Sequence, residues 1–132
     1  MKYMLDTNIC IYLIRQQAPE VGTRFAECYY GNIVISAITL AELNAGVEKS
    51  RDSVLAKNAL DELLHDLPVV PFDQQAANEY GVKRLQDPDR RKNAMDRLIA
   101  SHAAALACIL VTNNLDDFEC YRDLITENWV DC

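Results

Sequence analysis

Four acidic residues stand close to short apolar runs of the sequence, near the points where buried strands are expected to end. A strand that ends on an acid carries the carboxylate to the edge of a sheet, outside the core. Several carboxylates gathered at one edge suit a hard divalent cation such as Mg²⁺ or Mn²⁺, which prefers oxygen ligands and keeps part of its hydration shell. The four acids are Asp6, Glu42, Asp96 and Asp117. The sequence predicts a metal site if they converge.

Each acid also has a purely structural interpretation. Asp6 is a good helix cap, and Glu42 completes a Thr39-Leu40-Ala41-Glu42 pattern that resembles a capping box. Asp96 is expected in the first turn of a helix, where the helix dipole favours a carboxylate by roughly 0.3–1 kcal/mol, and Asp117 is able to begin a short helix. Because helix N-termini alone disfavour a cation, only convergence of the acids makes a metal site.

Neutral polar residues accompany two of the acids. Thr112 and Asn114 follow the apolar run Ile109–Val111, and Thr7 and Asn8 follow Asp6 directly. Thr112 is placed to orient a carboxylate or a water, and Asn114 to hold a water or a phosphate oxygen. We interpret Thr7 and Asn8 as caps and supports for the acids. The alternative is that the Asn-Asn pair simply forms a turn.

Basic residues cluster in sequence near Asp96. They include Arg91, Lys92 and Arg97, which we interpret either as a rim that guides phosphates or as an ordinary solvated surface. His102 lies six residues after Asp96, which on a helix directs the two side chains to different faces. We therefore expect a core or surface histidine there rather than a general base.

Apolar spacing predicts strands that alternate with helices along the chain. Such alternation is typical of an α/β domain, with a central parallel sheet of four to five strands and helices on both faces. Ligands of such sheets bind beyond the carboxyl ends of the strands. The predicted strands are residues 3–6, 33–36, 67–72, 109–112 and 124–126, and the predicted helices are residues 9–16, 19–30, 39–49, 53–64, 73–85, 94–107 and 116–121.

The composition favours one compact unit. We expect the 132 residues to form a single domain over residues 1–132, with half of them hydrophobic. No apolar run reaches the roughly 20 residues of a membrane span, and five unpaired-looking cysteines suit a reducing cytoplasm. A net charge of −7 argues against broad nucleic-acid binding. Two considerations weaken this argument: a bound metal would neutralise acids that are grouped around it, and an acidic chain suits a basic partner.

Four segments together resemble one family. They are Tyr3-Met-Leu-Asp6-Thr-Asn-Ile, Ile35-Ser-Ala-Ile-Thr-Leu-Ala-Glu42-Leu, Asp96-Arg-Leu-Ile-Ala-Ser-His-Ala and Leu110-Val-Thr112-Asn-Asn-Leu-Asp-Asp117-Phe. The ordered set resembles the PIN-domain ribonucleases across essentially the whole chain, and most of all the VapC-type toxins of bacterial toxin–antitoxin pairs.

This resemblance implies an Mg²⁺- or Mn²⁺-dependent endoribonuclease that inhibits translation by cutting exposed loops of tRNA or ribosomal RNA. It places the family's first three acids on Asp6, Glu42 and Asp96, and the fourth on Asp117, although some members carry an acid at the position of Asn114. It also implies a homodimer and a VapB-like antitoxin that covers the active site.

The chain departs from the family just before the third acid. Members commonly have a glycine-rich stretch there, whereas this sequence has Arg91-Lys-Asn-Ala-Met95, which weakens any inference about substrate preference. Three other classes are less compatible with the residues. A phosphoacceptor domain requires adjacent acids after the first strand, and an aspartyl-phosphate phosphatase requires an acid where Asn8 stands. A PIN-like module without catalysis, which binds nucleic acid or protein, remains the alternative.

Overall fold

A five-stranded parallel sheet forms the centre of the described part of the chain, residues 1–87 and 94–130 of a computed structural model. The strand order is β3-β2-β1-β4-β5, and every neighbouring pair is parallel. This arrangement confirms the predicted α/β class. The strands are β1 (Tyr3–Leu5), β2 (Ile33–Ser36), β3 (Val69–Val70), β4 (Ile109–Val111) and β5 (Thr126–Glu127).

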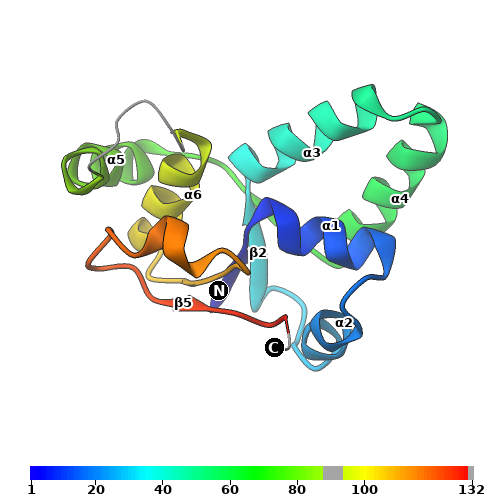
Figure 1. Cartoon of the computed structure of the whole chain (residues 1–132), viewed down its shortest axis with the longest axis horizontal. Helices are drawn as coiled ribbons and strands as arrows, with labels where there is room; N and C mark the ends of the chain where they lie inside the picture. Colours follow the sequence, from blue (N-terminus) through cyan, green and yellow to red (C-terminus); the bar gives the residue numbers. More distant parts are fainter. Residues whose placement is uncertain (88–93, 131–132) are drawn as a thin grey trace.

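Helices connect the strands and cover both faces of the sheet, as predicted (Figure 1). The helices α5 and α6 lie together on one side, and α1 to α4 lie on the other. The helices are α1 (Thr7–Arg15), α2 (Pro19–Ala26), α3 (Ala37–Lys49), α4 (Ser53–His65), α5 (Gln74–Gln86) and α6 (Ala94–Ala105), with a short 3₁₀ helix η1 (Leu115–Phe118).

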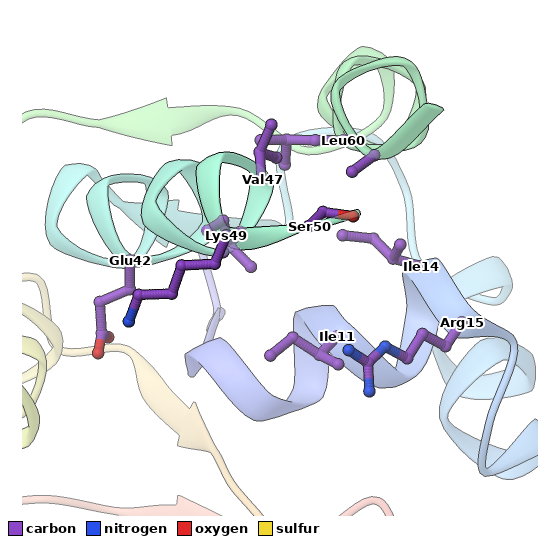
Figure 2. A pocket seen from close by; sticks show the side chains of 11 residues that line it. Ile11, Ile14, Arg15, Glu42, Val47, Lys49, Ser50 and Leu60 are labelled. Atoms are coloured by element: carbon purple, nitrogen blue, oxygen red, sulfur yellow. The ribbon is translucent and has the colours of Figure 1, made fainter. Parts of the chain in front are cut away.

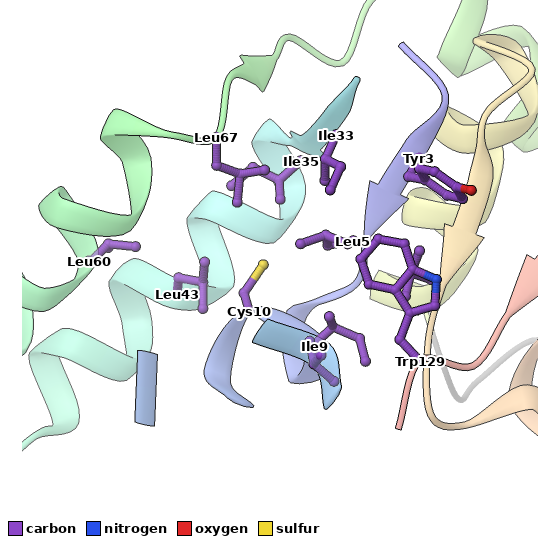
Figure 3. Close-up of a cluster of buried hydrophobic side chains, with 12 residues drawn as sticks. Tyr3, Leu5, Ile9, Cys10, Ile33, Ile35, Leu43, Leu60, Leu67 and Trp129 are labelled. Carbon is purple, nitrogen blue, oxygen red and sulfur yellow. The ribbon is translucent and has the colours of Figure 1, made fainter. Parts of the chain in front are cut away.

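The alternation of side chains along β1 divides the core into two clusters. Tyr3 and Leu5 point to the side of α1 and α4, whereas Met4 between them points to the side of α6. The first cluster contains Ile9, Leu43 and the indole of Trp129 (Figure 3). Both faces of the strand are therefore buried, which explains why the strand sequences are apolar throughout.

Trp129 packs the C-terminal segment against the first strand. Its ring meets Tyr3 edge to face with centroids 5.1 Å apart, and its Nε1 donates to Glu127 at 3.0 Å. Arg24 lies over the same indole, 4.7 Å from the ring centroid. The segment after β5 thus closes one side of the larger core.

Several predicted boundaries were wrong by a few residues. The second helix ends at Ala26 instead of near residue 30, and the third begins at Ala37 instead of Thr39. The strand predicted over residues 67–72 is only Val69–Val70. Proline has no N–H to donate to a sheet, so Pro68 and Pro71 limit that strand, and Pro68 contributes only its carbonyl, to the Ile35 N–H. The last strand begins at Thr126 rather than at Leu124.

The cysteines of the described residues are free thiols. Cys10 and Cys108 are buried, whereas Cys28 is only half-buried. In the described part of the chain, no helix is both long and apolar enough to cross a membrane.

Candidate metal site at the carboxyl edge of the sheet

The carboxyl ends of β1, β2 and β4 meet at one edge because these three strands are adjacent and parallel. Asp6 directly follows β1, and its N–H donates to the Val111 carbonyl at the end of β4, at 3.0 Å. Thr112 follows β4 at the same level. The residues that the sequence places after different strands are thereby brought side by side.

Asp6 is held by hydrogen bonds at both carboxylate oxygens. Oδ1 accepts from the Ile9 N–H at 3.2 Å and caps α1, while Oδ2 accepts from the Thr112 hydroxyl at 2.6 Å. The side chain is only 5% exposed, and this burial raises the pKa of the Asp6 carboxyl despite the hydrogen bonds. Asp6 can therefore cap α1 and also belong to the acidic cluster.

Thr112 links Asp6 to the turn that follows β4. Its hydroxyl donates to Asp6 and accepts from the Asn114 N–H at 3.0 Å. A hydroxyl with its donor and acceptor sites both engaged has a defined orientation. The Asn114 side chain is exposed, so in this structure it is the backbone of Asn114 that supports the site.

Glu42 reaches the same edge from the second turn of α3. The Thr7 hydroxyl donates to its Oε1 at 2.6 Å, across 35 residues of sequence. The capping-box interpretation of Glu42 was wrong, because α3 begins two residues earlier than Thr39. The Ser36 hydroxyl accepts from the Ile38 N–H and caps the helix, while Thr39 is buried inside it.

Asp96 stands in the first turn of α6, half-buried. Its pKa is raised to about 6, first by burial and then by the negative charges of Asp117, Asp6 and Glu42. Asp6, Glu42 and Asp117 are therefore all within electrostatic reach of Asp96. Asp117 lies on η1 and is exposed. Asn8, also exposed, contributes its backbone N–H to Asp6.

The four carboxylates are near one another without enclosing an ion. In residues 1–87 and 94–130, no three His, Cys, Asp or Glu side chains are arranged closely enough to hold a metal. None of the ion pairs within this part of the chain includes any of the four acids. The donors are nevertheless hard oxygens that suit Mg²⁺ or Mn²⁺. The repulsion that raises the pKa of Asp96 is what a dication would relieve.

The predicted basic rim was partly wrong. Arg97 is 1% exposed and its guanidinium is ion-paired with Asp87, so it offers nothing to a phosphate in solution. Lys83 of α5 is also fully buried, beside Glu79. The physical reason is that Arg97 is rotated by about 100° around α6 from Asp96 and faces α5 instead of the edge. Arg91 and Lys92 lie outside the described residues.

His102 is a core residue, as the spacing suggested. Its ring is 1% exposed, its Nδ1 lies 2.7 Å from the Ser36 hydroxyl, and Phe72 packs against it edge to face. Burial lowers its pKa. It does not join the acidic cluster.

Sequence reasoning missed several contacts near the edge. Tyr121 and Asp87 join Arg97 in a buried polar cluster, and the Asn113 amide donates to the Tyr12 hydroxyl at 2.8 Å. The partners in these contacts are 10 to 101 residues apart. No rule of sequence spacing relates these partners. The distribution of apolar residues around α6 was the one sequence feature that could have predicted a buried Arg97.

An open groove runs beside the acidic edge, between α1, α3 and α4. Its volume is about 450 Å³, and Glu42 stands at one end of it (Figure 2). The walls are mainly aliphatic, with Ile11, Ile14 and Val47 among them, and two cations, Arg15 and Lys49, also line it. The groove and the acidic edge thus share one residue.

Comparison with known proteins gives a consistent result. Residues 3–123 match the PIN domain. The chain is 39% identical to "Ribonuclease VapC2" of Rickettsia felis and 37% identical to "tRNA(fMet)-specific endonuclease VapC" of Shigella flexneri, and each alignment covers 98% of both proteins.

Solved structures agree with the sequence comparison. The fold superposes on a chain of the Rickettsia felis VapBC2 complex bound to a promoter DNA fragment, with a TM-score of 0.89 and 38% identity over 98% of this chain and 99% of that one. It also superposes on DNA-bound VapBC from Salmonella typhimurium, with a TM-score of 0.89, 34% identity and 98% coverage of each chain.

Proposed function

The chain belongs to the PIN domain family, among the VapC ribonucleases, and from that premise we propose that it is the endoribonuclease toxin of a toxin–antitoxin pair, dependent on Mg²⁺ or Mn²⁺. We propose one PIN domain over residues 1–132, acting in the cytoplasm, where RNA is translated. The observation that carries the proposal is the gathering of acids at one edge of the sheet, where Thr112 and Thr7 hold Asp6 and Glu42 by 2.6 Å hydrogen bonds and Asp96 lies within reach of their charges.

The four carboxylates are the proposed metal ligands and catalytic groups. Asp6, Asp96 and Asp117 would hold the ion directly or through water, and Glu42 would support it. Thr112 and Thr7 would keep Asp6 and Glu42 oriented through the two 2.6 Å hydrogen bonds. A bound divalent ion supplies Lewis acidity and lowers the pKa of water, which favours hydrolysis of a phosphodiester.

The proposed reaction is attack of water on the phosphorus, with departure of the 3′-oxygen of the preceding nucleotide. The oxygen of the water forms the new bond to phosphorus as the bond from phosphorus to the 3′-oxygen breaks. The proton of the water passes to the carboxylate cluster or to solvent, and the departing 3′-oxygen takes a proton from solvent. Nothing in this step uses the RNA 2′-hydroxyl. The products therefore carry a 5′-phosphate and a 3′-hydroxyl, and 2′,3′-cyclic ends in a digest would contradict the proposal.

We propose that the substrate is an exposed loop of tRNA or ribosomal RNA. The relatives from Shigella flexneri and Salmonella typhimurium are named as tRNA(fMet)-specific endonucleases. A looped single strand offers its backbone and its splayed bases to a protein surface, which suits a site at the rim of a sheet. The net charge of −7 argues against a broad basic surface as the source of RNA affinity, and we propose that the metal contributes to binding.

We further propose a VapB-like antitoxin as the regulatory partner and a homodimer as the toxin assembly. The solved complexes of the relatives from Rickettsia felis and Salmonella typhimurium are titled as VapBC assemblies bound to DNA. The groove supports this proposal, because an apolar antitoxin segment lying in it would end beside Glu42. The acidity of the chain suits a basic partner.

The test is cleavage of total bacterial RNA by the purified, antitoxin-free protein, with Mg²⁺, with EDTA, and as Asp6→Asn. Discrete fragments that require metal and vanish in the variant are expected, and sequencing of their ends identifies the substrate. Asp116→Asn is a matched control, because Asp116 is the exposed acid next to Asp117 and has no proposed site role. Intact RNA in every reaction of the folded protein would favour a PIN module that binds without catalysis.

A further inference from the structure

Arg97, Asp87 and Tyr121 form a buried polar cluster behind the acidic edge. The Arg97 guanidinium donates to Asp87 Oδ2, and the Tyr121 hydroxyl donates to the same oxygen at 3.3 Å. The three side chains are 1%, 7% and 2% exposed. Breaking one of these interactions would leave a buried charge without a partner, which costs free energy. The three side chains therefore hold one another in place.

The cluster joins three elements of the fold. Asp87 is the C-cap of α5, Arg97 lies in the first turns of α6, and Tyr121 follows η1. The Tyr80 ring of α5 adds a contact, with the guanidinium 5.7 Å from its centroid. Near Tyr121, Phe118 of η1 packs on the apolar face of α6 in the smaller core cluster. The start of α6 and the end of η1 are therefore tied to one carboxylate.

Two of these elements also carry proposed metal ligands. Asp96 immediately precedes Arg97, and Asp117 stands on η1, four residues before Tyr121. Phe118 of the same 3₁₀ helix packs with Ile99 and Ala103 of α6 in the smaller core cluster. The Arg97–Asp87–Tyr121 hydrogen bonds add a polar tie between the start of α6 and the segment after η1, so they fix the two elements that carry Asp96 and Asp117.

We propose that Arg97, Asp87 and Tyr121 are positioning residues, which fix the start of α6 and the segment after η1 and thereby keep Asp96 and Asp117 beside the proposed metal site. This inference rests on the proposed function of the acidic edge. It assigns to Arg97 a structural role in metal binding, in place of the contact with substrate that its sequence position suggested. Loss of the cluster would weaken metal binding by about tenfold or more, as loss of outer partners of metal ligands does elsewhere.

Tyr121→Phe is the most informative variant, because it removes a single hydroxyl and keeps the ring in the core. Asp87→Asn keeps the size of the side chain and removes its charge. The control is Lys83→Met, which also removes a buried cation of α5. The partner of Lys83 is Glu79 on the same helix, at 3.4 Å, so this pair ties no two elements together.

The experiment measures Mn²⁺ affinity of the folded variants by calorimetry, and the backbone amide shifts of Asp96 and Asp117 in the metal-free protein by NMR. We expect Tyr121→Phe and Asp87→Asn to weaken Mn²⁺ binding about tenfold and to move both amide signals, while Lys83→Met leaves both unchanged. Unchanged amide signals and unchanged affinity in Tyr121→Phe and Asp87→Asn would overturn the positioning role.

The two proposals fail in different ways. If the natural sequence bound no Mn²⁺ under these conditions, the proposed metal-dependent nuclease would fail, and the amide signals would still decide whether the cluster positions Asp96 and Asp117. If the natural sequence bound Mn²⁺ and the variants bound it equally, with unmoved signals, only the positioning role would fail.

Discussion

Asp96 and Arg97 are adjacent in sequence and belong to the same turn of α6, yet they have opposite environments. Arg97 is buried and its charge is neutralised by Asp87. Asp96 is half-buried among three other acids and is absent from the ion pairs found within residues 1–87 and 94–130. One turn of helix therefore carries a stabilising charge toward the core and a destabilising charge toward the edge.

We propose that this contrast separates a charge that serves stability, on Arg97, from a charge that serves the proposed metal site, on Asp96. A charge inside a fold is tolerated when a partner and hydrogen bonds satisfy it. Asp96 has negative neighbours instead, which raise its pKa to about 6 after the effect of burial. A fold retains such repulsion where a function requires it, at some loss of stability. The following predictions test that division.

The largest expected effect is on catalysis by the acidic edge. Asp96→Asn should lower RNA cleavage by more than the roughly 10- to 100-fold that loss of an outer partner costs, because it removes a charged oxygen ligand and weakens metal binding directly. Single-turnover cleavage at saturating Mg²⁺ measures the effect. Asp116→Asn serves as the control with the same chemical change on an exposed acid, and equal activity of the two variants would remove Asp96 from the site.

The next effect is on stability at the buried side of the same turn. Arg97→Met should lower the free energy of unfolding by about 3–5 kcal/mol, because it leaves the Asp87 carboxylate buried without its cation. Urea denaturation in EDTA measures it. Lys83→Met should cost less, because its partner Glu79 is 36% exposed and can be hydrated. A cost for Arg97→Met below that of Lys83→Met would contradict the contrast between the two sides of α6.

A smaller effect is expected from the hydroxyl that orients Asp6. Thr112→Val keeps the shape of the side chain and removes the 2.6 Å hydrogen bond to Oδ2. Cleavage should fall about 10- to 100-fold, with the loss mainly in the apparent Mg²⁺ affinity. Thr112→Ser retains the hydroxyl and should restore most of the activity. An unaffected Thr112→Val variant would show that Asp6 is oriented well enough by the cap of α1.

The smallest effect concerns the stability of the metal-free protein as a function of pH. The pKa of Asp96 is about 6 in the folded chain, against an ordinary value of 3.8 that applies to the unfolded chain. At a pH between these two values, the unfolded chain has released a proton that the folded chain retains. Stability contributed by Asp96 is therefore lost as the pH rises through this window. Asp96→Asn should be more stable than the natural sequence at pH 7 and equal to it below about pH 4.

Thermal unfolding of both proteins in EDTA across this pH range measures the difference. Mg²⁺ should reverse the order at pH 7, since it stabilises only the chain with the intact acid. Metal affinity should also fall on acidification below about pH 6, where a proton competes for Asp96. A constant difference between the two proteins at every pH would contradict the raised pKa of Asp96.

Local sequence patterns were sufficient for the fold class and for the approximate positions of the five strands. Apolar runs such as Tyr3–Leu5 and Ile109–Val111 are buried on both faces because helices cover both sides of a parallel sheet. Errors occurred where the signal was short, as at β3, because the prolines on either side restrict the strand to two residues. Family resemblance added the order of the acids, which no single motif specifies.

The identity of the four acids, the place of Asp6 at the end of a strand and the place of Asp96 in the first turn of a helix were properties of the sequence itself. Their convergence, the bonds of Asp6 to Thr112 and of Glu42 to Thr7, and the burial of Arg97 depended on the tertiary structure. The reason is distance along the chain. Periodicity relates residues within a helix or a strand, whereas Thr112 and Asp6 meet across 106 residues, and only the parallel pairing of β1 with β4 brings them together.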